Sequence, residues 1–379
     1  MDFRLSEEHR SLLTTATRLA EERFAPRAFT WKGYPWENAR VLADAGFTGI
    51  TFPREDGGQG GSLMDAVVIM DAISKICPES GDAVQATNFG AIQQVATFGS
   101  PMIKKEVLPD LLAGKALVTP GMSEPEAGSA LTDLRTSARY DGDHVVIDGT
   151  KVWNSYGPDA THVVVWCRFG PRTADIGAVV VPTDAPGFSK GSTEWYMGGQ
   201  PHCALYFDGC RVPRENVLCD SEGIRKMMQV FNIERIGNAV RSVALAEAAF
   251  DQAVGYAKER KSFGRPLCEF QGIQWKFADM KMQLDAARLL IYRAVANADH
   301  GPVDALEASI AKLFANEIAF AVANQALQVF GAVGYSTQLP IEHLLRKIRG
   351  WMIAGGSAEI LRNRIAEGVF NRRFSQRLP

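Results

Sequence analysis

The spacing of apolar residues divides this chain into three stretches. In residues 5–112 the apolar positions recur at helical intervals, with one interruption at the glycine-rich run 53–61. In residues 116–222 the pattern changes to short alternating or β-branched runs, which are typical of strands. After Gly223 the helical interval returns over longer segments. The pattern therefore predicts a small sheet domain between two helical domains.

The last stretch contains the clearest amphipathic helices. Its first apolar face alternates spacings of four and three residues and consists of Ile273, Phe277, Met280, Leu284, Ala287, Ile291, Ala294 and Ala298. A second face consists of Ile236, Val240, Val243, Phe250, Val254 and Ala257, and a shorter third face of Ile310, Phe314, Ile318 and Ala321. Long helices with one apolar face each pack economically as a four-helix bundle.

We therefore predict an α+β fold that is mainly α. It has an N-terminal α-helical domain at residues 1–115, a middle β-barrel or sheet domain at 116–222 and a C-terminal α-helical bundle at 223–379.

The middle stretch has four runs with strand character, at residues 145–147, 163–167, 176–181 and 204–207. The pair Asp148-Gly149 predicts a hairpin with a two-residue connection, in which residues 150–153 form the returning strand. The pair Asp208-Gly209 predicts the end of the fourth run.

An aromatic residue and several small residues gather at the mouth of this predicted sheet. Trp153 ends the hairpin and Ser155 lies just beyond it, while Met122, Ser123 and Ser129 lie in loops at the same edge. An indole face beside hydroxyls and backbone NH groups suits a flat ring with polar edges, such as a flavin.

Composition and charge exclude several classes of function. The 41 Lys and Arg residues against 43 Asp and Glu residues give a net charge of −2, which disfavours a nucleic acid partner. The N-terminal residues are charged where a signal peptide is apolar, and no apolar run approaches the length of a membrane span, so we expect a cytoplasmic protein. Six cysteines without CxxC spacing and six scattered histidines predict no disulfide and no metal site.

A bound dinucleotide would need a phosphate site unlike that of a Rossmann fold. The chain has no GxGxxG turn after a strand and no GxxxxGK[ST] loop. Arg260, Ser262 and Phe263, with Gln271 further on, offer a guanidinium, a hydroxyl and a stacking face instead. Such residues also occur at the solvated end of an ordinary helix, and both interpretations stay open.

Five motifs occur in the order in which the acyl-CoA dehydrogenase family carries them. They are SEPEAGS at residues 123–129, WNSYG at 153–157, the segment from RKSFG to a glutamine at 260–271, QVFGAVGY at 328–335 and AGGS at 354–357. The first four match the family patterns, whereas the fifth lacks the usual Glu. The chain resembles this family along nearly its whole length.

The resemblance implies FAD as cofactor and an acyl-CoA as substrate. It places the isoalloxazine ring against Trp153, with Ser155 near the N5 edge and Met122 and Ser123 near the pyrimidine edge. It also assigns to FAD binding Ser129, Arg260, Ser262, Phe263, Gln271, Gln328, Ser357 and Glu359, and to substrate binding Ser129, Phe231, Arg235 and Gly355.

In the family, much of the FAD contact comes from a neighbouring subunit. The resemblance therefore implies a homodimer or homotetramer, with an electron-transferring flavoprotein as the electron acceptor.

The position of the catalytic base is the main departure from the family. Most members carry a Glu in the tail motif, and Gly355 stands in its place here. Some members carry the base on a C-terminal helix directly before an arginine, which makes Glu234 the candidate base of this chain. The alternative is that Asn232 caps a helix and that Glu234 lies in its first turn, where the helix dipole favours a negative charge by about 0.3–1 kcal/mol.

Three reactions or roles follow from these alternatives. With Glu234 as base, the protein dehydrogenates a short branched or alicyclic acyl-CoA to the 2-enoyl-CoA. Without a base, it is a 3-sulfinopropionyl-CoA desulfinase-type lyase or an enoyl-CoA reductase, and a flavin-free binding module is the third possibility. The resemblance places part of the acyl pocket at residues 85–94. Between residues 56 and 103 the only basic residue is Lys75, so this part of the pocket offers no cation to an anionic acyl group. The polar residues Thr87, Asn88, Gln93 and Gln94 contact the substrate or are ordinary helix-face residues.

Overall fold

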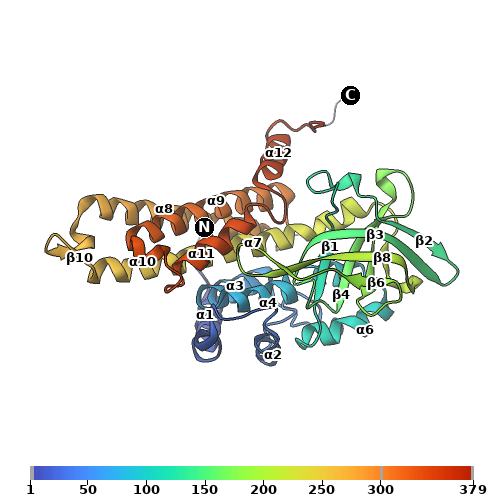
Figure 1. The fold of residues 1–379 in the computed structure, drawn as a ribbon, viewed down its shortest axis with the longest axis horizontal. Coiled ribbons are helices and arrows are strands. Elements are labelled where there is room, and N and C mark those ends of the chain that lie inside the picture. The colour runs from blue at the N-terminus through green and yellow to red at the C-terminus, as the bar shows by residue number, and fades with distance from the viewer. Residues whose placement is uncertain (1–3, 299–301, 377–379) are drawn as a thin grey trace. The chain divides into compact units, whose positions relative to one another are not determined.

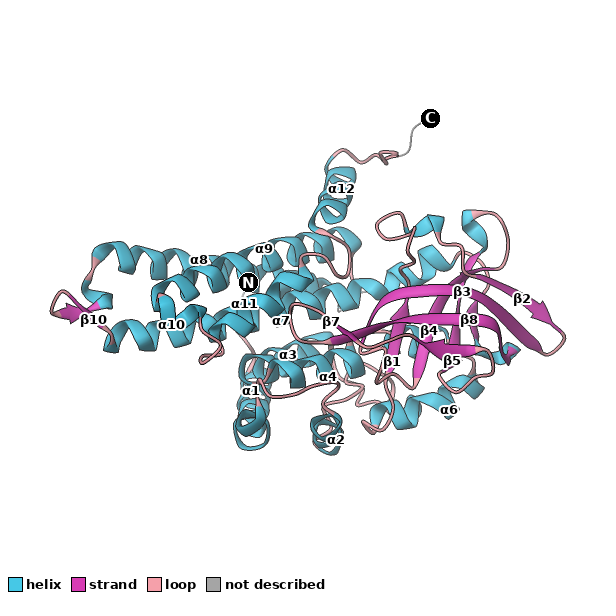
Figure 2. Ribbon diagram, in the orientation of Figure 1, coloured by secondary structure: helices cyan, strands magenta, loops and turns pink. Residues whose placement is uncertain are grey.

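The computed structural model describes residues 4–298 and 302–376, which form helices and one large sheet (Figures 1 and 2). The chain separates into two compact units. The helical unit comprises Met1–Phe29, Val67–Gly81 and Arg235–Pro379, and the sheet unit comprises Thr30–Ala66 and Asp82–Glu234.

The order of elements confirms the predicted fold class. The α-helices are α1 (Glu7–Leu19), α2 (Trp36–Asp44), α3 (Leu63–Ile76), α4 (Pro78–Asn88), α5 (Ile92–Phe98), α6 (Pro101–Leu112), α7 (Gly223–Glu259), α8 (Gln271–Asn297), α9 (Ala305–Phe330), α10 (Ala332–Tyr335), α11 (Ile341–Trp351) and α12 (Ala358–Val369). The strands are β1 (Val118–Gly121), β2 (Ser137–Asp141), β3 (His144–Ser155), β4 (His162–Arg168), β5 (Ile176–Pro182), β6 (Phe188–Lys190), β7 (Glu194–Trp195), β8 (Pro201–Pro213), β9 (Val217–Cys219), β10 (Lys261–Ser262) and β11 (Arg265–Pro266). The domain boundaries after residues 115 and 222 stay a prediction.

The sheet is mixed and is buried on both faces at its centre. Its strand order is β6-β8-β3-β2-β4-β5-β9, with β1 parallel to β4 and β7 paired to β8. Along β4, Val163 and Val165 point into one hydrophobic core, whereas Val164 and Trp166 point into another. This explains why β4 reads as a continuous apolar run rather than an alternating one.

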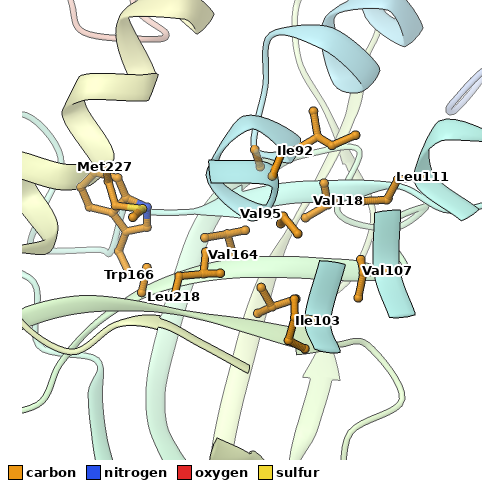
Figure 3. Packing of buried hydrophobic residues seen from close by; sticks show 14 of the residues in the cluster. Ile92, Val95, Ile103, Val107, Leu111, Val118, Val164, Trp166, Leu218 and Met227 are labelled. Atoms are coloured by element: carbon orange, nitrogen blue, oxygen red, sulfur yellow. The ribbon is translucent and has the colours of Figure 1, made fainter. Parts of the chain in front are cut away.

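The second of these cores joins the sheet to helices of the same unit (Figure 3). Ile92 and Val95 of α5, and Ile103 and Val107 of α6, pack in it, together with residues of the first turns of α7. Because α7 begins in this core, the sheet fixes the position of its first turns. Glu234 lies on the same helix, directly after these turns.

The hairpin predicted at Asp148-Gly149 is wrong, and so is the strand end predicted at Asp208-Gly209. Both β3 and β8 continue through these pairs, and their register shifts between Ile147 and Gly149. The shift is a β-bulge in which the Asp148 carboxylate accepts a hydrogen bond from the Gly209 NH at 2.7 Å. A Cβ at Gly149 would lie 2.5 Å from the Thr136 hydroxyl, so this glycine serves close packing rather than a turn.

The C-terminal helices form the predicted bundle. In the helical unit α8 packs against α9, and α9 against α11, while rings of α7 contact both α8 and α9. The predicted faces of α7 and α8 are largely buried. No helix in the described parts of the chain is long and apolar enough to span a bilayer.

The predicted face of α9 is wrong by one position. Ile310, Phe314 and Ile318 are only partly buried, and Ala321 is exposed. The fully buried residues are Ala308, Ser309, Ala311, Lys312, Ala315, Ala319, Val322, Ala323 and Ala326. Small side chains allow α9 to lie close to its neighbours, so close packing rather than side-chain size decides which face is inside.

Candidate active site

The predicted site residues belong to both units. Met122, Ser123, Ser129, Trp153, Ser155, Phe231 and Glu234 lie in the sheet unit, and Arg235, Gly355, Arg260, Ser262, Phe263, Gln271, Gln328, Ser357 and Glu359 lie in the helical unit. Each group is described within its own unit.

The end of β3 presents an exposed indole on a strained backbone. Trp153 is 62% exposed and has a φ of 60°. A left-handed conformation costs a non-glycine residue about 1–3 kcal/mol and persists where surrounding contacts enforce it. The register of β3 with β8 shifts between Lys151 and Asn154, which marks a second β-bulge here. The indole is therefore available as a flat apolar surface.

Two residues that were not predicted from the sequence hold this strand end. The Tyr196 hydroxyl donates to the Trp153 carbonyl oxygen at 2.8 Å, and the Ser155 side chain hydrogen-bonds the same phenol. Tyr196 stacks on His202 with ring centroids 4.1 Å apart, and His202 lies 5.2 Å from the indole ring. Burial raises the pKa of Tyr196 and lowers the pKa of His202, so both rings are neutral at neutral pH.

A buried ion pair anchors the loop before β2. The Glu124 carboxylate lies 2.7 Å from the Lys151 ammonium, and both side chains are buried. Glu124 also accepts hydrogen bonds from the backbone NH groups of Arg135 and Thr136 at 2.6 and 2.9 Å. Burial alone would raise the pKa of Glu124, but the Lys151 ammonium and these hydrogen bonds hold that pKa below its usual value. Burial lowers the pKa of Lys151 as well, against the attraction of the Glu124 carboxylate. Each charged partner stabilises the other across this short contact.

This anchoring brings Met122 and Ser123 to the strand that carries the indole. The Val152 NH donates to the Ser123 carbonyl oxygen at 2.9 Å, and Lys151 donates to the Met122 carbonyl oxygen at 3.1 Å. Ser129, at the other end of the same loop, is exposed. The structure thus joins four of the predicted flavin residues in one part of the sheet unit.

The strands β10 and β11 form a tight hairpin that carries the predicted phosphate residues. Ser262 pairs with Arg265, and Phe263 at the tip is 96% exposed with a φ of 52°. Arg260 directly before the hairpin and Gln271 at the start of α8 are also exposed. The ring meets Phe270 only edge-on, with centroids 6.3 Å apart, and its faces stay exposed, which suits a stacking ligand.

The tail between α11 and α12 contains two glycines in the left-handed conformation. Gly355 and Gly356 have φ values of 72° and 96°. The Gly355 carbonyl oxygen accepts a hydrogen bond from Arg235 Nε at 3.4 Å, and the Gly356 carbonyl oxygen accepts one from Lys312 Nζ at 3.1 Å. A Cβ at position 355 would lie 2.8 Å from Asn238 Nδ2 and 3.1 Å from Lys312 Cε. The backbone conformation and the neighbours both disfavour a side chain at this position.

Three other predicted residues lie near helix ends. Ser357 caps α12, because its hydroxyl accepts a hydrogen bond from the Ile360 NH at 3.4 Å. Glu359 lies in the first turn of α12. A hydrogen bond from the Glu359 backbone NH, and a smaller effect of the Ser357 hydroxyl, lower the pKa of the Glu359 carboxyl. Gln328 is exposed near the end of α9. Helix capping alone accounts for Ser357.

Glu234 lies inside α7 and not at a helix start. The helix begins at Gly223, about three turns earlier, so Asn232 does not cap it. The explanation by the helix dipole is therefore wrong, because that effect is confined to the first turn. Glu234 is half-buried with its Oε2 atom inside the protein, and the adjacent Phe231 and Arg235 are buried.

Most of the polar side chains between residues 85 and 94 are bonded within the sheet unit. The side chains of Asn88 and Gln93 bond backbone groups, and Gln94 accepts a hydrogen bond from the Trp166 indole NH at 3.1 Å. Thr87 donates to a carbonyl of its own helix at 2.9 Å. These four residues therefore stabilise the fold, which is the second of the two interpretations left open for them.

Family models match nearly the whole chain. The acyl-CoA dehydrogenase N-terminal domain matches residues 6–115, the middle domain matches 119–210 and the C-terminal domain matches 221–370.

Individual proteins resemble the chain over its full length. A 3-sulfinopropanoyl-CoA desulfinase of Paraburkholderia xenovorans is 37% identical, over 99% of each chain. A probable acyl-CoA dehydrogenase of Mycobacterium leprae is 34% identical, over 95% of each chain. The structure of butyryl-CoA dehydrogenase from Megasphaera elsdenii superposes with a TM-score of 0.91 at 30% identity, covering 98% of this chain and 100% of that one.

Proposed function

The chain belongs to the acyl-CoA dehydrogenase family, and from that premise we propose that it uses FAD to dehydrogenate a short branched or alicyclic acyl-CoA to the 2-enoyl-CoA. Glu234 is the proposed base. One observation carries this proposal: Arg235, which directly follows Glu234, is bonded to the carbonyl oxygen of Gly355, the residue that stands where most members carry their base.

The residues present fit FAD. Trp153 and Phe263 are both exposed aromatic residues with a positive φ, as residues that clamp a ring often are. Trp153 would hold the isoalloxazine ring with Ser155, Met122 and Ser123. Arg260, Ser262, Phe263, Gln271 and Gln328 of a second subunit would hold the adenosine and pyrophosphate. A homodimer or homotetramer is therefore part of the proposal.

The proposed reaction requires a base and a site for developing negative charge. The Glu234 carboxylate takes the proton from the α-carbon while a hydride leaves the β-carbon. When bound, FAD accepts this hydride at N5 of its isoalloxazine ring and passes the electrons to an electron-transferring flavoprotein. The Gly355 NH polarises the thioester oxygen, and Arg235 restrains the following peptide group by donating to the Gly355 carbonyl oxygen.

Helix geometry supports the placement of Glu234. Residues four apart on a helix share a face, so Glu234 and Asn238 lie on the same face of α7. Asn238 is the residue that a Cβ at Gly355 would meet first. In our proposal, the Glu234 carboxylate on this face of α7 therefore takes the role that the tail Glu has in most members of the family.

A carboxylate at position 355 is not expected to replace Glu234. In the double variant E234Q/G355E, flavin reduction by an acyl-CoA should stay as slow as in E234Q, because the φ of 72° and the 2.8 Å approach to Asn238 misdirect the new side chain. G355E should also lower the free energy of unfolding by about 1–3 kcal/mol. The control is G350A in α11, where a Cβ meets no atom within 4 Å. Recovery of the reduction rate in the double variant would contradict this account of the tail.

The hydroxyl of Tyr196 is expected to support FAD binding. In Y196F the Trp153 carbonyl loses its hydrogen bond and the strained strand end loosens, so the Kd for FAD should rise about 3- to 10-fold. Titration of the apoprotein with FAD, followed by quenching of flavin fluorescence, measures this. Y206F on β8 removes a hydroxyl from an exposed tyrosine and should leave the Kd unchanged. Equal FAD affinities of Y196F and wild type would exclude this role.

A desulfinase-type lyase is the second candidate, and the name of the Paraburkholderia relative favours it. That reaction needs a cation beside the sulfinate. In residues 56–103 the only basic residue is Lys75, and its ammonium is 2.6 Å from Asp251. An anionic acyl group therefore lacks a counter-charge from this stretch, which supports the dehydrogenase proposal.

Product analysis separates the candidates. We propose incubating the purified protein with a dye acceptor and a panel of branched, alicyclic and 3-sulfinopropanoyl thioesters, followed by mass spectrometry. The dehydrogenase proposal predicts loss of two hydrogens from a saturated thioester. Release of sulfite from 3-sulfinopropanoyl-CoA, with every saturated thioester unchanged, would establish the lyase instead. A colourless protein that changes none of them would be a binding module.

A further inference from the structure

Lys312 is a fully buried lysine whose side chain binds the tail that carries Gly355. It lies on α9 in the helical unit and has no exposed surface. Its Nζ atom donates hydrogen bonds to the Trp351 carbonyl oxygen at 2.9 Å and to the Gly356 carbonyl oxygen at 3.1 Å. Removing an ammonium group from water costs free energy that an apolar side chain of similar length would not cost. A purely structural position in the bundle would therefore favour methionine over lysine.

The two bonds of Lys312 hold the tail at both of its ends. Trp351 is the last residue of α11, and Gly356 lies two residues before α12 begins. The segment between them contains Gly355, with its φ of 72°. Two consecutive glycines have unusually large backbone freedom, so this segment needs several bonds to keep one conformation. A single ammonium group thus joins the start and the end of the segment.

Asn316 duplicates the first of these bonds but not the second. It lies one helical turn after Lys312 on the same face of α9, and its Nδ2 atom donates to the Trp351 carbonyl oxygen at 2.7 Å. The last carbonyl groups of a helix lack partners within that helix, so this bond completes the end of α11. In the parts of the chain that the structure describes, only Lys312 donates to the Gly356 carbonyl oxygen. The bond at Gly356 therefore depends on Lys312 alone.

The two tail glycines are bonded through their carbonyl oxygens and open at their NH groups. Arg235 Nε donates to the Gly355 carbonyl oxygen, and Lys312 Nζ donates to that of Gly356. Both glycines are partly exposed, and among the described residues no group accepts a hydrogen bond from either NH group. The NH groups are thus available to a ligand, while two cationic side chains bind the carbonyl oxygens.

We propose that Lys312 is a positioning residue of the thioester site. By binding both ends of the tail, it keeps the Gly355 NH in the orientation that polarises the thioester oxygen. Its positive charge, bonded to the same segment, also favours the enolate that forms there. This inference rests on the proposed function, because it takes the Gly355 NH as the donor to the thioester oxygen.

A chromogenic ligand measures this polarisation without turnover. 4-Dimethylaminocinnamoyl-CoA has an electron-donating amine conjugated with its thioester carbonyl, so its absorption band moves to longer wavelength when the thioester oxygen receives hydrogen bonds. It is already a 2-enoyl thioester and cannot be dehydrogenated. We expect the band to shift when the ligand saturates the wild-type FAD protein, and we expect K312M to lose about half of this shift or more.

The matched control is N316L. It removes a buried hydrogen bond to the same Trp351 carbonyl oxygen, so both variants should lower the midpoint of chemical denaturation. N316L leaves the bond at Gly356 intact and should keep the wild-type shift. K312Q retains a polar group, but its shorter side chain cannot reach both carbonyl oxygens, so it should lose as much of the shift as K312M. K312Q replaces K312M in the comparison if K312M does not retain FAD.

Two results overturn the inference: a full shift in K312M or K312Q, or a loss in N316L equal to that in K312M, which would make Lys312 a structural residue only. A wild-type protein that leaves the band unshifted overturns it as well. Failure of the proposed function appears separately, as flavin that stays oxidised with every saturated thioester while the shift still depends on Lys312.

Discussion

Replacing Glu234 with glutamine is expected to slow the reduction of bound FAD by an acyl-CoA about 10²- to 10⁴-fold, which is what a general base usually contributes. Glutamine keeps the size and polarity of the side chain but cannot take the α-proton. Position 234 lies inside α7, and glutamine and glutamate have similar helix propensities, so the helix should remain intact. Anaerobic rapid mixing, followed in the visible flavin band, measures the rate.

The control for this prediction is E259Q at the other end of α7. Glu259 is exposed, and its substitution should leave both the reduction rate and the FAD content unchanged. E234Q should likewise keep its FAD, because no part of the proposed FAD site depends on Glu234. A reduction rate in E234Q equal to that of wild type would remove Glu234 from the mechanism.

Replacing Lys151 with methionine is expected to lower the free energy of unfolding by about 3–5 kcal/mol. The Lys151 side chain is fully buried and lies 2.7 Å from Glu124, so its removal leaves a buried carboxylate without a counter-charge. The loop at Met122 also loses a hydrogen bond. Chemical denaturation of the full chain measures the change.

An exposed ion pair of equal length provides the control for K151M. Arg139 and Asp148 in the same sheet are also 2.7 Å apart, but their side chains are 64% and 44% exposed, so R139M should change the stability by less than about 1 kcal/mol. Adding E124Q to K151M should recover part of the lost stability, because the uncompensated charge is then gone. If K151M and R139M were equally mild, the buried pair would not anchor the loop.

Periodicity predicts the order of elements well in this chain, but it predicts local details poorly. The helical intervals of α7 and α8 correctly indicate a bundle, because each helix needs one continuous buried face. The pair Asp148-Gly149 misleads because Asp-Gly suits a tight turn and a β-bulge equally well, and only the pairing of β3 with β8 decides between them. In α9 the buried face consists mainly of alanines, which carry little signal beside Ile310 and Phe314.

The candidate site shows the same limit. Motifs indicate Trp153, Gly355 and the hairpin around Phe263, because these residues lie within short recognisable segments. The partners of these residues, such as Tyr196, come from another part of the chain, and no local pattern links them to the motifs. The start of α7 also lies outside the motifs, so only the structure could exclude a helix-start carboxylate at Glu234.

The most direct test of the proposed function is an anaerobic titration of the wild-type FAD protein with branched and alicyclic acyl-CoA thioesters. Our account predicts that at least one of them bleaches the oxidised flavin band, with one 2-enoyl-CoA formed per flavin reduced. Flavin that remains oxidised with every saturated thioester, while 3-sulfinopropanoyl-CoA is converted with release of sulfite, would contradict it.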